Sequence, residues 1–136
     1  MAARSNRVLP ALTPENQHFW TGGARGALCF LRCTKCRHFV HPPAPICSEC
    51  LSRDLEVTTV SGRGVVYTYT VNHQSWFPGM LTPFVIAIVE LAEQPGLRLT
   101  TNLVNCSIDQ VKIGMPVRAV FENHDAVWIP LFEPAL

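Results

Sequence analysis

The sequence lacks any long hydrophobic run, and this absence excludes a membrane-spanning helix. Such a helix needs about 20 consecutive apolar residues, whereas the longest strongly apolar stretch here covers residues 84–89. No secretory signal peptide is evident either, because Arg4 and Arg7 are followed by a short mixed segment rather than by an apolar core. We therefore expect a cytoplasmic protein without membrane association, a setting in which cysteines stay reduced.

An excess of charge of one sign is also missing, since the net charge at pH 7 is only +1. Six Lys and Arg stand against three Asp and Glu in residues 25–63, but three stand against six in residues 64–136. Proteins that bind nucleic acid usually carry a basic stripe with interleaved aromatic side chains. This pattern is not seen, so the composition argues against a nucleic-acid partner.

Four of the six cysteines stand in two close pairs, Cys33 with Cys36 and Cys47 with Cys50, and ten residues separate the pairs. A Cys-x-x-Cys turn places two thiolates on one side of a metal ion, and two such turns complete a closed tetrahedral shell that suits structural zinc. A redox dithiol is the alternative, but it needs a single reactive pair near a βαβ pattern. The spacing therefore predicts a zinc ribbon with no open catalytic position.

The residues around these pairs are interpreted as bystanders. Zinc-binding turns often place glycine after the second cysteine, where φ is positive, but Arg37 and Leu51 stand there. A mixed Cys/His ligand set is conceivable, because Cys29, His38 and His41 lie nearby. We expect Cys29 to belong to an apolar run and both histidines to lie on a loop surface.

The remaining pattern predicts a mainly β protein with a short N-terminal helix. Thr13, Pro14 and Glu15 mark a helix start and Gly22 and Gly23 its end. Strands are predicted over residues 55–60, 65–71, 84–91, 97–104, 116–122 and 127–132, and a helical turn follows Ser107.

Glycines 62 and 64 suggest that the first two of these segments form one bent strand. Five strands with a helical link between the third and the fourth are typical of a five-stranded OB-fold barrel, with an SH3-like barrel as the alternative. We divide the chain into an N-terminal tail and helix (1–24), a rubredoxin-like zinc ribbon (25–54), and an OB-fold domain with a C-terminal arm (55–136).

A set of motifs over residues 13–134 resembles one known family, the acyl-CoA-associated OB-fold proteins with an N-terminal rubredoxin-like zinc ribbon. The motifs are Phe19-Trp20, Leu31-Arg32-Cys33 with Cys36, Pro42-Pro43, Cys47 with Cys50, Val60-Ser61-Gly62-Arg63-Gly64-Val65-Val66-Tyr67, and Ile113-Gly114-Met115-Pro116-Val117. The resemblance implies a noncatalytic accessory subunit that binds a thiolase-superfamily (lipid-transfer-protein-like) enzyme in a hetero-oligomer and helps to form its CoA and acyl site.

The partner's reaction would be a thiolase reaction or a retro-aldol cleavage of an acyl-CoA. Residues 71–79 resemble the branch that acts on CoA thioesters of steroid side chains. A subunit of an enoyl-CoA hydratase complex is one alternative. A single-stranded nucleic-acid-binding OB-fold module is an alternative from a different class.

Catalysis by this chain alone is not expected. Retro-aldol cleavage needs a base and donors for the enolate, and thiolase chemistry needs an activated cysteine with a histidine. His73 is the best candidate base, and His124 stands in a predicted turn, but a solvated loop position is the simpler interpretation of both. Cys106 stands alone and is interpreted as a buried, inert thiol.

Three segments are interpreted as partner-facing: the predicted helix, the loop 72–83 and the C-terminal arm. The residues assigned to the partner interface are Phe19, Trp20, Trp76, Phe77, Met80, Trp128 and Phe132. The alternatives are core packing for the helix, a plug at the barrel mouth for the loop, and a plain last strand for the arm. Arginine matches phosphate geometry well, so the CoA-binding residues are expected among Arg63, Arg32 and Arg37.

Overall fold

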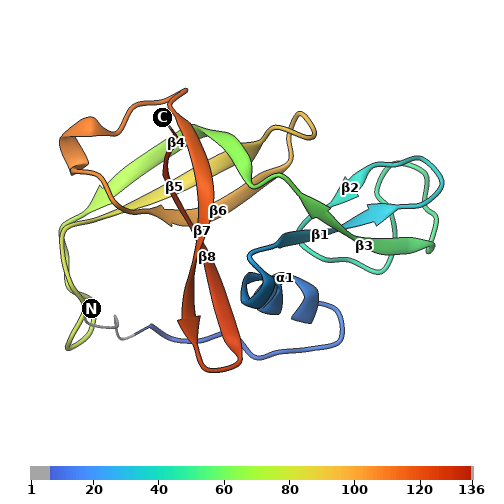
Figure 1. Cartoon of the computed structure of the whole chain (residues 1–136), viewed down its shortest axis with the longest axis horizontal. Coiled ribbons are helices and arrows are strands. Elements are labelled where there is room, and N and C mark those ends of the chain that lie inside the picture. The colour runs from blue at the N-terminus through green and yellow to red at the C-terminus, as the bar shows by residue number, and fades with distance from the viewer. Residues whose placement is uncertain (1–6, 136) are drawn as a thin grey trace.

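The computed structural model describes residues 7–135. Residues 1–6 of the predicted N-terminal tail, and residue 136, lie outside this range. Two β structures follow one another along the chain: a three-stranded sheet in the order β2-β1-β3, and a closed barrel in the order β4-β5-β6-β8-β7 (Figure 1). Within the described range, no helix is both long enough and apolar enough to cross a membrane.

The N-terminal helix is shorter than predicted. Helix α1 spans Gln17–Thr21 and continues as the 3-10 helix η1, Gly22–Arg25. The predicted start at Thr13 is a capped turn, because Thr13 and Asn16 accept hydrogen bonds from each other's backbone amides and the carbonyl oxygen of Thr13 accepts from the amide of Gln17 at 2.9 Å. The regular helix begins after this turn, at Gln17.

The predicted end at the glycine pair is confirmed for the α-helix, whose C-cap is Gly22, and the 3-10 turn η1 then continues to Gly26, which has a left-handed φ of 67°. The glycine pair also permits close packing. A Cβ on Gly22 would lie 2.3 Å from the carbonyl oxygen of Ala27, and one on Gly23 would lie 2.6 Å from the side chains of Phe121 and Trp128.

The ribbon sheet is built on β1, Leu28–Cys33, which pairs antiparallel with β2, Phe39–Val40, and with β3, Leu55–Val60. Residues 55–60, which we expected at the start of the barrel, thus pair with β1 of the ribbon. The chain crosses into the barrel between Val60 and Arg63, where Gly62 has a φ of 77°. The glycine-rich segment therefore joins the two sheets.

The barrel contains the five predicted strands: β4 Arg63–Asn72, β5 Phe84–Leu91, β6 Arg98–Leu103, β7 Pro116–His124 and β8 Val127–Pro134. The 3-10 turn η2, Ile108–Gln110, links the third to the fourth, and Ser107 and Gln110 form its capping box. Because β4 pairs with both β5 and β7, the sheet closes on itself as an OB-fold. Gly64 is required at this closure, since a Cβ there would lie 2.4 Å from the carbonyl oxygen of Glu90.

The predicted C-terminal arm is a barrel strand. β8 pairs with β7 from Val127 to Pro134, and Phe132 is fully buried. An extended arm for a neighbouring chain is therefore wrong, because these residues complete the barrel.

One hydrophobic core joins the helix, the base of the ribbon and the barrel. It contains Phe19 and Phe30 together with barrel residues such as Val89 and Phe132. The tip of the ribbon has a separate small cluster of Cys33, Val40 and Cys47. So few apolar residues make only a small core.

Candidate metal centre and partner-facing surfaces

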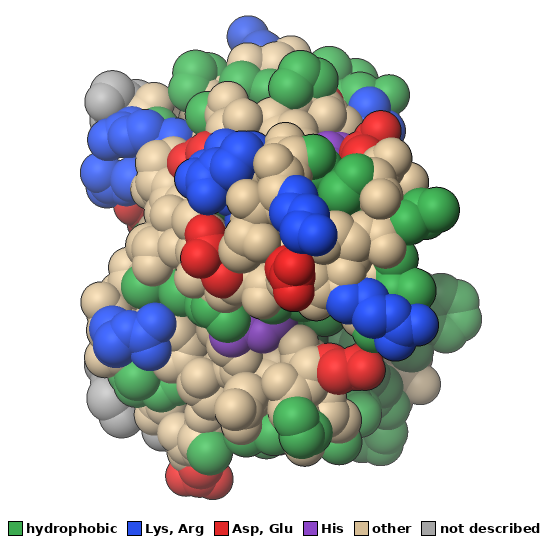
Figure 2. Space-filling view, turned by 90° about the vertical axis from the view of Figure 1, so that its right-hand side faces the viewer, with side chains coloured by type: hydrophobic (Ala, Val, Ile, Leu, Met, Phe, Trp, Pro, Cys, Tyr) green, Lys and Arg blue, Asp and Glu red, His purple; other side chains and the backbone are tan. Residues whose placement is uncertain are grey.

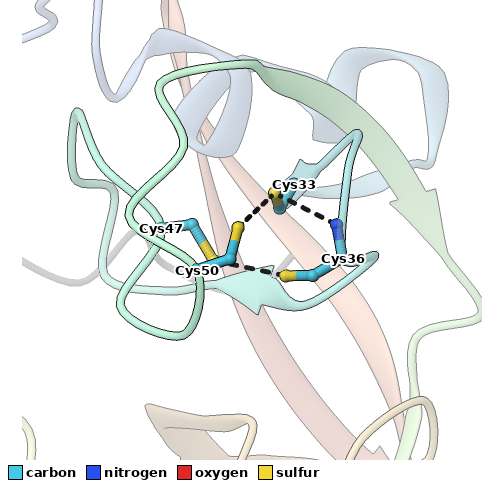
Figure 3. A group of neighbouring side chains, drawn as sticks. All are labelled: Cys33, Cys36, Cys47 and Cys50. Atoms are coloured by element: carbon cyan, nitrogen blue, oxygen red, sulfur yellow. Dashed lines mark hydrogen bonds between the residues drawn. The ribbon is translucent and has the colours of Figure 1, made fainter.

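The four paired cysteines meet at the tip of the ribbon, as Figure 3 shows. Cys33 ends β1, Cys36 follows in a tight turn, and Cys47 and Cys50 form a second turn in the loop before β3. Their sulfur atoms all lie within 4.8 Å of one another. The Sγ atoms of Cys33 and Cys50 are 3.5 Å apart, and so are those of Cys36 and Cys47.

This geometry fits a tetrahedral zinc ion. With Zn–S bonds of about 2.3 Å, the sulfur atoms of a regular tetrahedron lie roughly 3.8 Å apart, which agrees with the observed range. All four positions are filled by thiols, so the site would be closed and structural. Among the described residues, this is the one cluster of Cys, His, Asp or Glu side chains placed to hold a metal ion.

Backbone amides prepare the cluster for a cation. The amide of Cys36 donates to Sγ of Cys33 at 3.5 Å, and the amide of Glu49 donates to Sγ of Cys47 at 3.4 Å. The first of these bonds is the main cause that lowers the pKa of Cys33 to about 6, although burial opposes it.

At Cys36 the amide of His38 acts to lower the pKa, but burial and the neighbouring thiols together raise it to about 12. Four thiols this close cannot all ionise without a compensating cation. The cluster therefore favours a divalent metal.

Both zinc-binding turns have the positive φ that normally selects glycine. Arg37 has a φ of 69° and Leu51 a φ of 63°. Their amides donate to the carbonyl oxygens of Cys33 and Cys47, at 3.0 and 2.9 Å. The turn geometry is thus the usual one, but Arg37 and Leu51 are sterically strained in it because each carries a Cβ.

Of the three neighbouring residues, two are bystanders as predicted. Cys29 is fully buried on β1, where its Sγ lies 3.6 Å from Oγ1 of Thr59. His38 is near Glu49 at the ribbon tip, with 3.9 Å between Nε2 and Oε1. The surface position predicted for His41 is wrong, because its ring lies 4.5 Å from that of Phe30 and 4.8 Å from that of Phe19.

The three arginines expected to bind CoA are not equivalent. Arg32 lies over the Phe39 ring at 4.4 Å and donates to the carbonyl oxygen of Arg37 at 2.7 Å, and Arg37 pairs with Glu56 at 3.5 Å. Arg63 is exposed and lines a shallow depression of about 370 Å³ with Gly64, Val65 and Glu90. Arg63 and Arg37 are thus both exposed, whereas Arg32 is half-buried.

The surface at the ribbon end of the molecule carries both positive and negative charge. In Figure 2 basic and acidic side chains alternate over this face. Lys35 lies 3.7 Å from Asp54, and Arg37 pairs with Glu56. Such mixed charge does not form the stripe that phosphate backbones require.

The loop 72–83 exposes apolar side chains while its backbone is held by internal hydrogen bonds. Trp76 is 70% exposed, Leu81 67% and Phe77 36%. Nε1 of Trp76 donates to Oδ1 of Asn72 at 3.1 Å, and the Ser75 hydroxyl donates to the carbonyl oxygen of Phe77 at 3.1 Å. An ordered loop that presents large apolar side chains to solvent has the character of a protein-docking surface.

Met80 lies in the same loop and is half-buried, whereas the remaining residues assigned to the partner interface lie elsewhere. Phe19 is 4% exposed and Phe132 fully buried, so both are core residues and their assignment to a surface is wrong. Trp20 is half-buried edge-on against Phe19, with ring centroids 4.7 Å apart. Trp128 is half-buried on β8, beside Gly23.

The two candidate histidine bases lie in different settings. His73 is exposed in the loop, as predicted. His124 is not a solvated turn residue, because it is 8% exposed and its Nε2 lies 2.6 Å from Oε1 of Glu122. Burial acts to raise the pKa of Glu122, but hydrogen bonds from His124 and Arg7 lower it, so the group is an ionised structural carboxylate. Burial raises the pKa of the Cys106 thiol, which makes it a poor nucleophile.

Two family models match the chain. The model for the ChsH2 rubredoxin-like zinc ribbon domain covers residues 20–56, and the model for the ChsH2 C-terminal OB-fold domain covers residues 57–122. Among curated proteins, a DUF35 domain-containing scaffold protein of Methanocaldococcus jannaschii is 41% identical over 103 residues, which are 73% of this chain and 70% of that protein.

A probable enoyl-CoA hydratase alpha subunit of Thermomonospora curvata is 37% identical over 131 residues. The match covers 96% of this chain but only 40% of the hydratase subunit. Among solved structures, a chain of the Ltp2-ChsH2(DUF35) aldolase is 36% identical, with a TM-score of 0.84 over 94% of this chain and 100% of that one.

Proposed function

Since the chain belongs to the DUF35 family of zinc-ribbon and OB-fold proteins, we propose that it is a noncatalytic accessory subunit in a hetero-oligomeric complex that acts on acyl-CoA. Its partner would be a thiolase-superfamily enzyme that cleaves acyl-CoA by a thiolase or retro-aldol reaction. The resemblance to a chain of the Ltp2-ChsH2(DUF35) aldolase supports this choice. We also predict that the acyl group is a steroid side chain, because residues 71–79 resemble the branch that acts on such CoA thioesters.

The exposed apolar loop is the observation that carries the proposal. Trp76 and Leu81 together present large apolar surface at the tip of the barrel hairpin β4–β5. Tryptophan is enriched among the residues that dominate binding energy, where truncation to alanine costs about 2 kcal/mol or more. Internal hydrogen bonds of Trp76 and Ser75 restrict the loop, which would reduce the conformational entropy lost when a partner covers it.

The remaining features have supporting roles in this proposal. The zinc site would hold the ribbon rigid rather than take part in chemistry, because its four ligands leave no open position. Arg63, at the junction of ribbon and barrel, would contact a CoA phosphate from outside the partner's active site. The reacting groups would come from the partner.

A capture experiment with paired variants tests the proposal. The tagged chain, Trp76→Ala and Val57→Ala would each be incubated with extract of the source cells, and bound proteins would be identified and quantified. Val57 is a suitable control because it is exposed, at 52%, but lies on β3 of the ribbon. We expect a stoichiometric thiolase-superfamily protein with the wild type and with Val57→Ala, and at least a tenfold loss with Trp76→Ala. Equal capture by all three would remove the loop from the interface, and capture of no acyl-CoA enzyme would overturn the proposal.

A hydratase complex is the second candidate, favoured by the similarity to the hydratase alpha subunit. The chain spans about 40% of that protein. A hydratase partner would therefore have to supply what the rest of the alpha subunit contributes. Identification of a hydratase rather than a thiolase-superfamily protein in the same capture experiment would select this alternative.

A further inference from the structure

A groove of about 630 Å³ lies where the helix, the ribbon and the barrel meet. Its volume is within the range of roughly 300–1,000 Å³ that is usual for small-molecule sites. In Figure 1 helix α1 lies between the ribbon sheet and the barrel. Apolar side chains from four segments line the groove: Phe19, Trp20, Ile86, Leu99, Ile129 and Leu131.

A few polar groups stand among these apolar side chains. Arg7 lies at the groove and is held there by two hydrogen bonds, from Nε to Oε1 of Glu122 at 2.6 Å and from an Nη to Oδ1 of Asn102 at 2.9 Å. These bonds leave further N–H donors of the guanidinium for a ligand. Arg7 is thus a pre-positioned donor for an oxygen-bearing group.

His41 adds a buried group whose hydrogen-bonding capacity is unused. Its Nδ1 is buried and has no hydrogen-bond partner among residues 7–135. A buried polar atom without a partner is unfavourable, and the His41 side chain forms part of the groove wall. Burial, with a smaller contribution from His18, lowers the pKa of His41 to about 4, so the imidazole is neutral at pH 7.

We propose that this groove binds an acyl group, with the apolar chain against Leu99, Ile129 and Leu131 and the carboxyl or thioester end toward Arg7. An apolar lining with a small number of placed donors is the usual composition of a site for such a ligand. The choice of a CoA thioester over the free acid as the ligand rests on the proposed function. The inference that the groove binds an apolar chain with an oxygen-bearing end rests only on the residues that line the groove.

Titration of the zinc-loaded full chain with dodecanoate tests the groove, with dodecanol as the uncharged probe. We expect saturable binding of dodecanoate to one site. Ile129→Ala should weaken it about 5- to 10-fold through lost apolar contact. Ile113→Ala is the matched control, since Ile113 is 68% exposed and does not line the groove, and it should leave affinity unchanged. Absence of saturable binding, or equal affinities of the two variants, would overturn the proposal.

Arg7→Met tests the orientation of the ligand. It should weaken dodecanoate about tenfold and leave dodecanol nearly unchanged, because only the carboxylate gains a charge-assisted hydrogen bond. Equal losses for both probes would contradict the placement of the carboxyl end.

Tryptophan fluorescence gives a readout that does not depend on a weakened variant. Trp20→Phe should remove most of the fluorescence change that accompanies dodecanoate binding, whereas Trp76→Phe should retain this change. The reverse result would place the ligand at the exposed loop and overturn the proposal.

Binding assays with dodecanoate, dodecanoyl-CoA and CoA test this inference independently of the proposed function. Binding of dodecanoate and dodecanoyl-CoA, but not of CoA alone, supports the groove even if no thiolase-superfamily partner is captured. Capture of the partner without binding of either acyl ligand would overturn the groove and leave the proposed function standing. Binding of dodecanoate but not of dodecanoyl-CoA would overturn the thioester as the natural ligand.

Discussion

The imidazole of His41 stacks on the ring of Phe30, with centroids 4.5 Å apart and planes inclined by 29°. His41 follows β2 in the ribbon, and Phe30 lies on β1 within the main core. The stack thereby attaches the loop between the two zinc-binding turns to the core that the ribbon shares with the barrel. One prediction concerns this joint, two concern the metal site beside it, and one concerns the packing of η1 on the barrel.

The first prediction concerns the pH dependence of stability. Because burial lowers the pKa of His41 from 6.5 to about 4, the unfolded chain binds more protons than the folded one between these values. The free energy of unfolding should therefore fall as pH decreases from about 6.5 toward 4, and His18, whose pKa is also lowered by burial, acts in the same direction.

His41→Phe should reduce the loss of unfolding free energy between pH 7 and pH 5 by about 1–2 kcal/mol, measured by urea unfolding at equal zinc content. His73→Gln is the control, since His73 is exposed. An unchanged slope for His41→Phe would show that His41 is not buried in its neutral form.

The second prediction concerns the metal. Cys47→Ser should release zinc and unfold the ribbon tip, because Cys47 is fully buried in the small cluster with Cys33 and Val40. The barrel should stay folded, since its core is separate from that cluster. Zinc content and amide NMR spectra measure the two effects. Cys106→Ser, which changes a thiol outside the cluster, should keep its zinc, and a fully metallated Cys47→Ser would show that another ligand set holds the metal.

The third prediction uses the strained turn at Leu51. Its φ of 63° is unfavourable for a residue with a Cβ. Leu51 is also 74% exposed, so little packing is lost on substitution. Leu51→Gly should therefore raise the free energy of unfolding of the ribbon by about 0.5–1 kcal/mol and slow the transfer of zinc to a chelator. Leu81→Gly, at an exposed position without positive φ, should be neutral or destabilising. Faster zinc loss in Leu51→Gly would mean that its side chain contributes more than the strain costs.

The fourth prediction concerns the contact between η1 and the last two strands. A Cβ on Gly23 would lie 2.6 Å from both Phe121 and Trp128, which is too close without movement. Gly23→Ala should destabilise the fold by about 1–3 kcal/mol, seen as a lower midpoint in thermal unfolding. Ala24→Ser, at the exposed neighbour, should change the midpoint little. A midpoint equal to the wild type for Gly23→Ala would show that η1 can shift away from the barrel.

The sequence predicted the elements whose signal is local. Alternation of apolar residues located the five barrel strands, and the paired cysteines identified a metal cluster that the structure assembles within 4.8 Å. The misplaced strand was set by contacts between distant residues. Residues 55–60 belong to the ribbon because β1 is their pairing partner.

What the sequence determined by itself was the class of the fold and which four cysteines meet in one cluster, because strand periodicity and Cys-x-x-Cys spacing are properties of a few neighbouring residues. Only the tertiary structure decided which aromatic residues are accessible: Phe19 and Phe132 entered the core, whereas Trp76 stayed exposed. It also created the groove, whose lining extends from Arg7 to Leu131 along the chain. Burial depends on what packs against a side chain, and that is known only once the helix, the ribbon and the barrel have come together.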